Sequence, residues 1–155
     1  MTKQLENDYK NTDNFDKNGI RISKSLTIDG NGYTIDALSK GRIFRVTASN
    51  VILKNINFIN GNTDGNGGAV YWHGNRGVLS GSNFTGNNAN TRGGAVYWGG
   101  NHGNLTGSNF TGNNAGEGGA VRWDGNRGVL SGSSFTGNTA GEGGAIGMYS
   151  GTVTN

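Results

Sequence analysis

The segment from Gly67 to Arg92 reads GGAVYWHGNRGVLSGSNFTGNNANTR, and the chain repeats it almost letter for letter. Further copies begin at Gly93 and Gly118, and a fourth begins at Gly143 with GGAIGMYS. The copies therefore start 26, 25 and 25 residues apart. Self-similarity at such a fixed spacing indicates a solenoid or repeat array, in which each copy is one structural unit.

The composition of the repeat favours strands over helices. The chain has 31 Gly among 155 residues and no Pro or Cys. Glycine, asparagine, β-branched and aromatic residues disfavour helices and suit short strands joined by tight bends. A propeller blade needs about 40 residues, whereas about 25 residues fit one turn of a parallel β-helix with three strands and three bends. We therefore predict an all-β fold, a right-handed parallel β-helix (β-solenoid) of about five coils of ~25 residues.

The repeat extends upstream in a diluted form. Leu53 and Phe58 keep the spacing of the later leucine and phenylalanine columns. We expect residues 18–155 to form the β-helix, with clear repeats from residue 67, and residues 1–17 to form a polar N-terminal cap, with or without a short helix. Such a cap protects an unpaired strand edge. The final residues, GMYSGTVTN, show no comparable cap, which makes end-to-end self-association an expected interaction.

Variation between the copies predicts which columns face inward. The position of Tyr71 becomes arginine and glycine in later copies, so this column faces solvent. Because side chains alternate along a strand, the neighbouring tryptophans point inward. The leucine and phenylalanine columns are five residues apart and need a bend near Gly81–Ser82 to share the interior. The predicted apolar ladders are Trp72, Trp98 and Trp123; Leu79, Leu105 and Leu130; and Phe84, Phe110 and Phe135.

Asn87, Asn113 and Asn138 form a polar column in the same register. We expect a buried ladder in which the amides bond to the backbone of the bends and to one another. The alternative is a column of exposed turn asparagines in the left-handed backbone region.

Two motifs carry a resemblance to known families. The pairing of GGAV or GGAI with FTGN resembles the GGAI and FxxN motifs of polymorphic outer-membrane protein repeats. The run NGIRISKSLTIDGNGYTIDA and its continuation to GGAVYW resemble the adhesin-like surface proteins of methanogenic archaea, over roughly residues 18–149. The resemblance implies a non-catalytic segment of a surface or secreted protein that acts as a rigid stalk or a carbohydrate- or protein-binding surface. Its partners would then be carbohydrate or a surface protein of a host or partner cell.

Two alternatives to an adhesin-like segment stay open. The close agreement of the copies also fits a designed or consensus scaffold without a natural ligand. The family implies a signal peptide ahead and anchoring domains behind, whereas the polar N-terminus of this chain lacks an apolar signal core, so we expect no signal peptide here. The second alternative is a β-helix related to polysaccharide lyases or hydrolases.

The acidic residues argue against an enzyme. Hydrolysis of polysaccharides needs clustered carboxylates, and a lyase needs several carboxylates around Ca²⁺. From residue 40 onward the chain has four acids, Asp64, Glu117, Asp124 and Glu142. Glu117 and Glu142 share a column with Arg92, which we interpret as an exposed loop column where the arginine offsets one glutamate. We expect no catalytic residues.

Other ligand classes are disfavoured by the composition. His73 and His102 are the only histidines and fall in different columns, so we expect no metal and no cofactor. The net charge is only +3, with 13 basic residues scattered among 10 acidic ones, so we expect no nucleic-acid partner. No apolar run reaches ~18 residues, so we expect no membrane insertion.

The outward columns are the expected place for a ligand. Aromatic rings beside polar groups, spaced ~4.8 Å apart along the coils, suit stacking on sugar rings or binding of a peptide. The alternative is the ordinary amphipathic surface of a solenoid. The candidate residues are Tyr71, Tyr97 and Arg122, then His73 and Asp124 two positions on, and Arg76, His102 and Arg127 in the next bend.

Overall fold

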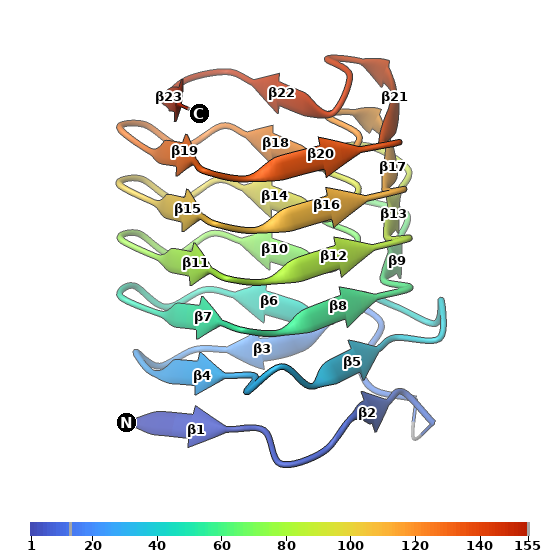
Figure 1. The fold of residues 1–155 in the computed structure, drawn as a ribbon, viewed down its shortest axis with the longest axis vertical. Coiled ribbons are helices and arrows are strands. Elements are labelled where there is room, and N and C mark those ends of the chain that lie inside the picture. Colours follow the sequence, from blue (N-terminus) through green and yellow to red (C-terminus); the bar gives the residue numbers. More distant parts are fainter. Residues whose placement is uncertain (13, 155) are drawn as a thin grey trace.

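The chain forms a parallel β-solenoid, which confirms the predicted fold class. The structure, a computed structural model, describes residues 1–12 and 14–154 and contains strands but no helix within them. In Figure 1 the nearer strands run from left to right, the more distant strands run back, and the chain climbs from the N-terminus to the C-terminus. This path is a right-handed coil, as the crossover rule for parallel strands predicts.

Each coil contributes one short strand to each of three long sheets, and these strands have three residues each except β2, which has two. Sheet A contains β1 (Thr2–Gln4), β4 (Thr27–Asp29), β7 (Ile52–Lys54), β11 (Val78–Ser80), β15 (Asn104–Thr106), β19 (Val129–Ser131) and β23 (Thr152–Thr154). Sheet B contains β2 (Tyr9–Lys10), β5 (Thr34–Asp36), β8 (Asn57–Ile59), β12 (Asn83–Thr85), β16 (Asn109–Thr111) and β20 (Ser134–Thr136).

The other long sheet, sheet C, lies behind sheet B in Figure 1. Its strands are β3 (Ile20–Ile22), β6 (Phe44–Val46), β10 (Val70–Trp72), β14 (Val96–Trp98), β18 (Val121–Trp123) and β22 (Ile146–Met148). Between sheets B and C the later coils add a short sheet D, which the sequence did not predict. It contains β9 (Asn62–Thr63), β13 (Asn88–Ala89), β17 (Asn114–Glu117) and β21 (Thr139–Glu142).

The bend between sheets A and B lies where the sequence predicts it. Gly81 has a φ of 57°, and Gly107 and Gly132 repeat this left-handed geometry in the next two coils. Asn55 takes the same place upstream with a φ of 57°. Glycine and asparagine tolerate this region better than other residues. The bend turns both Leu79 and Phe84 toward the interior, where neither is exposed.

Stacked aromatic rings fill the interior. The rings of Trp72 and Trp98 are 4.3 Å apart, those of Trp98 and Trp123 are 4.7 Å apart, and all three are fully buried. Their indole N–H groups find no acceptor in the described part of the chain, so burial and stacking hold the ladder. Gly103 makes room for it, because a Cβ there would lie 2.1 Å from the Nε1 of Trp98. A second ladder of parallel rings contains Phe58, Phe84, Phe110 and Phe135.

The asparagine column is a hydrogen-bonded ladder, buried at Asn87 and Asn113 and half-buried at Asn138, rather than a row of exposed turns. The Nδ2 of Asn87 donates to the Oδ1 of Asn113 at 3.0 Å, and the Nδ2 of Asn113 donates to the Oδ1 of Asn138 at 2.9 Å. The same amide groups also donate to backbone oxygens, as from Asn113 to Phe84 at 3.1 Å. Buried polar groups that are satisfied in this way fix the register of successive coils.

The N-terminal segment extends the solenoid to about six turns, one more than predicted. Strand β1 pairs with β4, and β2 pairs with β5, both in parallel register. Residues 1–12 and 14–17 contain no helix, so the segment covers the first full coil with strands. Every residue of β1 and β2 is exposed, which explains why no apolar pattern reveals these strands.

Candidate functional site

One outward column of sheet C collects aromatic and basic side chains. Strands β6, β10, β14 and β18 of this sheet each have three residues, of which the outer two turn inward and the middle one outward. The pairing register places the middle residues of β3, β6, β10, β14 and β18 side by side. We call this column the sheet C column, and its members in order are Arg21, Arg45, Tyr71, Tyr97 and Arg122.

Tyr71 and Tyr97 form the aromatic centre of the column. Their ring centroids are 5.1 Å apart and their planes differ by 18°. The His73 ring lies 6.4 Å from that of Tyr71, at an angle of 14°. Arg45, Tyr71 and His73 line a shallow hollow of about 320 Å³, together with Arg42 and Thr47. We call this depression the Tyr71 hollow.

Acidic residues neutralise the C-terminal half of the column. The Arg122 side chain donates to Asp124 at 2.6 Å and to Glu117 at 2.8 Å. Glu117 also lies 3.2 Å from the Nε of Arg92. The Tyr97 hydroxyl donates to Asp124 at 2.8 Å. Burial, this hydrogen bond and the negative charge of Asp124 raise the pKa of Tyr97 to about 12.

Arg42 is a functional candidate that the sequence analysis did not find. Its guanidinium lies 5.2 Å above the Tyr71 ring, and its side chain is buried in the wall of the solenoid. Burial lowers the pKa of Arg42 below its usual value; Tyr71 opposes this shift and the neighbouring charge of Arg45 adds to it. No sequence motif identifies Arg42, because its hydrogen-bond acceptors lie 21 to 25 residues away and are three backbone oxygens and one hydroxyl.

Arg21 and Arg45 were also missed, although a signal for them existed. Phe44 lies 26 residues before Val70, as the repeat register requires. This offset places Arg45 beside Tyr71, which is the pairing found in the structure. Extending the register by one more coil places Arg21 beside Arg45.

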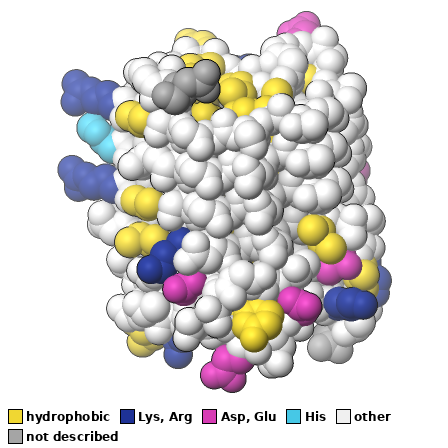
Figure 2. Space-filling view, in the orientation of Figure 1, with side chains coloured by type: hydrophobic (Ala, Val, Ile, Leu, Met, Phe, Trp, Pro, Cys, Tyr) yellow, Lys and Arg dark blue, Asp and Glu magenta, His cyan; other side chains and the backbone are white. Residues whose placement is uncertain are grey.

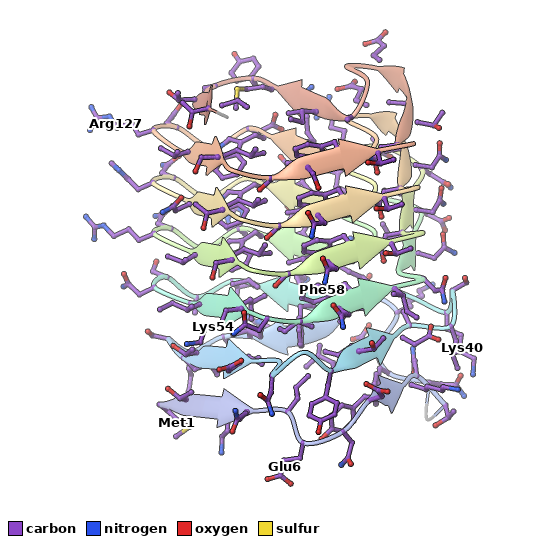
Figure 3. The ribbon with its side chains drawn as sticks, viewed as in Figure 1. Met1, Glu6, Lys40, Lys54, Phe58 and Arg127 are labelled. Atoms are coloured by element: carbon purple, nitrogen blue, oxygen red, sulfur yellow. The ribbon has the colours of Figure 1, made fainter. Side chains whose placement is uncertain are left out.

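The remaining predicted residues form a separate column. Arg76, His102 and Arg127 occupy the bends between sheets C and A, with φ values of 54°, 56° and 55°, and their side chains are exposed. Arg127 projects away from the coils in Figure 3. Figure 2 shows basic side chains and a histidine projecting from this edge, whereas the later coils of the face in view carry mostly uncharged side chains. The structure thus groups Tyr71, His73, Tyr97, Arg122 and Asp124, but not the bend column, on one face.

The column of glutamates has a structural explanation. Glu117 and Glu142 are neighbours in register, but Glu117 is held by two arginines and Glu142 is exposed. Arg122 is a counter-ion that the sequence analysis did not assign to Glu117. Across residues 1–12 and 14–154 no group of three or more His, Cys, Asp or Glu side chains is placed to hold a metal ion. The described residues also include no helix of the length and apolarity needed to cross a membrane.

Comparison with known proteins gives no matching family, no matching curated protein and no matching solved structure.

Proposed function

We propose that this chain is a non-catalytic β-solenoid segment that acts as a rigid stalk with a carbohydrate-binding face. The observation that carries the proposal is the stacked pair of Tyr71 and Tyr97 on the outer surface of sheet C. Tyrosine rings present an apolar face and a polar tip, which suits the alternating C–H and hydroxyl surfaces of a sugar. Arginine and aspartate beside the rings supply hydrogen bonds to the hydroxyl groups.

The rigidity of the scaffold supports this role. The two tyrosines sit on adjacent strands whose inward neighbours, Trp72 and Trp98, are fully buried. Their spacing is therefore fixed before a ligand arrives, and little conformational entropy is lost on binding. A sugar chain lying along the solenoid axis would meet Tyr71 in one coil and Tyr97 in the next.

The proposed location of the protein, at the cell surface or secreted, rests on the resemblance to adhesin-like surface proteins. The motifs GGAV and FTGN recur once per coil, at Gly67 and Phe84 and at their equivalents. A stalk built from coils of nearly equal length lengthens without changing its cross-section, which suits the presentation of a binding face away from a surface. A surface protein of a host or partner cell is the alternative ligand for the same face.

A glycan array tests the carbohydrate-binding face. The wild-type chain is compared with the variant carrying Tyr71→Ala and Tyr97→Ala, and with Tyr33→Ala, which removes a half-buried tyrosine near sheet B. Binding should disappear in the double variant and persist in Tyr33→Ala, with circular-dichroism spectra unchanged. Binding that survives the double change places the site elsewhere. Absence of glycan binding by the wild-type chain would reject the proposal and favour a scaffold without a natural ligand.

The enzyme alternative has its own assay. Incubation with acidic polysaccharides would produce new ultraviolet absorbance for a lyase, or new reducing ends for a hydrolase. We expect neither product, because Glu117 is engaged by Arg92 and Arg122. Turnover that Glu117→Gln abolishes would overturn the non-catalytic proposal.

A further inference from the structure

We propose that the ligand of the sheet C column is an anionic saccharide, whose sulfate or carboxylate group binds in the Tyr71 hollow against Arg45 and Arg42, with Arg21 beside Arg45 on the adjacent strand. This inference rests on the proposed carbohydrate-binding function and specifies the class of sugar. It comes from the difference in charge between the two halves of the column.

Two arginines stand side by side at the N-terminal end of the column. Arg21 and Arg45 are direct partners in the register of β3 and β6. Like charges in this position repel each other. Within the described residues no carboxylate lies within 4.0 Å of either guanidinium, since the four ion pairs present involve other cations. An anion bound between them would relieve this repulsion.

Arg42 adds a third positive charge in a less solvated position. Its side chain is 8% exposed. It donates to the backbone oxygens of Gly67 at 2.9 Å, Asn18 at 2.7 Å and Asn66 at 2.6 Å, and to the Thr63 hydroxyl at 3.3 Å. These acceptors fix the guanidinium but carry no formal negative charge. Buried charges are normally paired, and a charge in a low-dielectric wall acts strongly on its surroundings.

The C-terminal half of the column has no comparable excess of positive charge. There Arg92 and Arg122 already contact Glu117, and Arg122 also contacts Asp124. An anion near Tyr97 would have to displace or repel these carboxylates. The Tyr71 hollow is therefore the position along the column that favours an anionic group.

The shape of the hollow fits a sugar that carries such a group. The planar guanidinium of arginine binds sulfate and carboxylate through paired hydrogen bonds. Tyr71 lies in the same hollow and offers a ring edge to the sugar, because Tyr97 and Arg42 already lie over its ring. A second hollow on the other side of Arg42 is lined by Lys17, Lys40 and Asp64, so the basic surface continues beyond the column with one acid in it.

Binding to matched pairs of oligosaccharides tests the inference. One pair is an oligogalacturonate and its methyl ester, and the other is a sulfated galactan oligosaccharide and its neutral, desulfated form, all measured by isothermal titration calorimetry. Wild-type protein should prefer the anionic member of at least one pair by roughly tenfold or more, and added salt should reduce that preference. The two pairs distinguish a carboxylate from a sulfate ligand.

Variants separate the charge from the ring. The double change Arg21→Gln and Arg45→Gln should abolish the preference and leave binding of the neutral sugar unchanged. A control with Lys3→Gln and Lys10→Gln removes the same charge from the exposed strands β1 and β2 and should keep the preference. Equal binding of both members of each pair, or a preference that survives the double arginine change, would overturn the inference alone. Binding of neither member would overturn the proposed function as well.

Discussion

Tyr97 and Trp98 are neighbours on strand β14, yet they belong to two regions that differ in how strictly their side chains repeat from coil to coil. Trp98 points inward, where the column reads tryptophan in three successive coils. Tyr97 points outward, where the column reads arginine, arginine, tyrosine, tyrosine and arginine. Repetition of side chains thus builds the fold of this solenoid, whereas departure from repetition on the outer face makes the charge of the surface differ from coil to coil.

The largest expected effect comes from truncating the inward member of this pair. Trp98→Ala removes a ring that stacks on both Trp72 and Trp123 and should lower the free energy of unfolding by about 3–5 kcal/mol. Tyr97→Ala removes a half-buried ring with one hydrogen bond and should cost about 1 kcal/mol. Urea denaturation of both variants measures the difference. Equal losses would contradict the division into an interior and an outer face.

Adjacent asparagines give a second, smaller contrast. Asn113→Ala deletes a link of the buried ladder and leaves the Asn87 amide and the Phe84 carbonyl without this partner. Each such group left unsatisfied costs about 1–3 kcal/mol. Asn114 is exposed, and Asn114→Ala should cost less than about 1 kcal/mol. Thermal unfolding of the two variants checks this order, and a larger loss for Asn114→Ala would refute the role given to the ladder.

The features of the fold that could be predicted from the sequence are those carried by side chains that repeat from coil to coil. The coil length, the inward tryptophans and the bend at Gly81 follow from columns that recur at fixed spacing. The first coil escaped prediction because β1 and β2 are exposed, so that their parallel pairing with β4 and β5 leaves no apolar pattern in the sequence. Arg42 escaped because its neutral acceptors leave no complementary side-chain pattern in the sequence.

The charge pattern of the candidate face was only partly predictable. The column of Arg92, Glu117 and Glu142 follows from the register, and one arginine offsetting one glutamate was expected. That Arg122 reaches both Glu117 and Asp124 depends on the rotamer of a long side chain, which spacing does not specify. The same reasoning explains why the contrast between the neutralised and the uncompensated half emerged only from the structure.

The smallest expected effect concerns the ionisation of Tyr97. Its pKa is raised from 10.0 to about 12, so the neutral form is favoured in the folded protein. The resulting stabilisation is fully present below pH 10 and is lost as the pH rises from 10 toward 12. Tyrosinate absorbance during an alkaline titration should show a late step that is missing in Tyr97→Phe. Asp124→Asn should move this step to lower pH, because it removes a negative charge beside the hydroxyl. A Tyr97 step at or below pH 10 would contradict the described contact.

Removal of one whole coil tests most directly whether the 25-residue repeat is the unit of this fold. Deleting Gly93–Glu117 joins Arg92 to Gly118 and keeps every inward column in register. Deleting Gly93–Leu105, about half a coil, places outward residues in inward columns. We predict that the whole-coil deletion retains a β-type circular-dichroism spectrum and a cooperative unfolding transition, and that the half-coil deletion loses both. Loss of structure in the whole-coil deletion, or its survival in the half-coil deletion, would contradict the account.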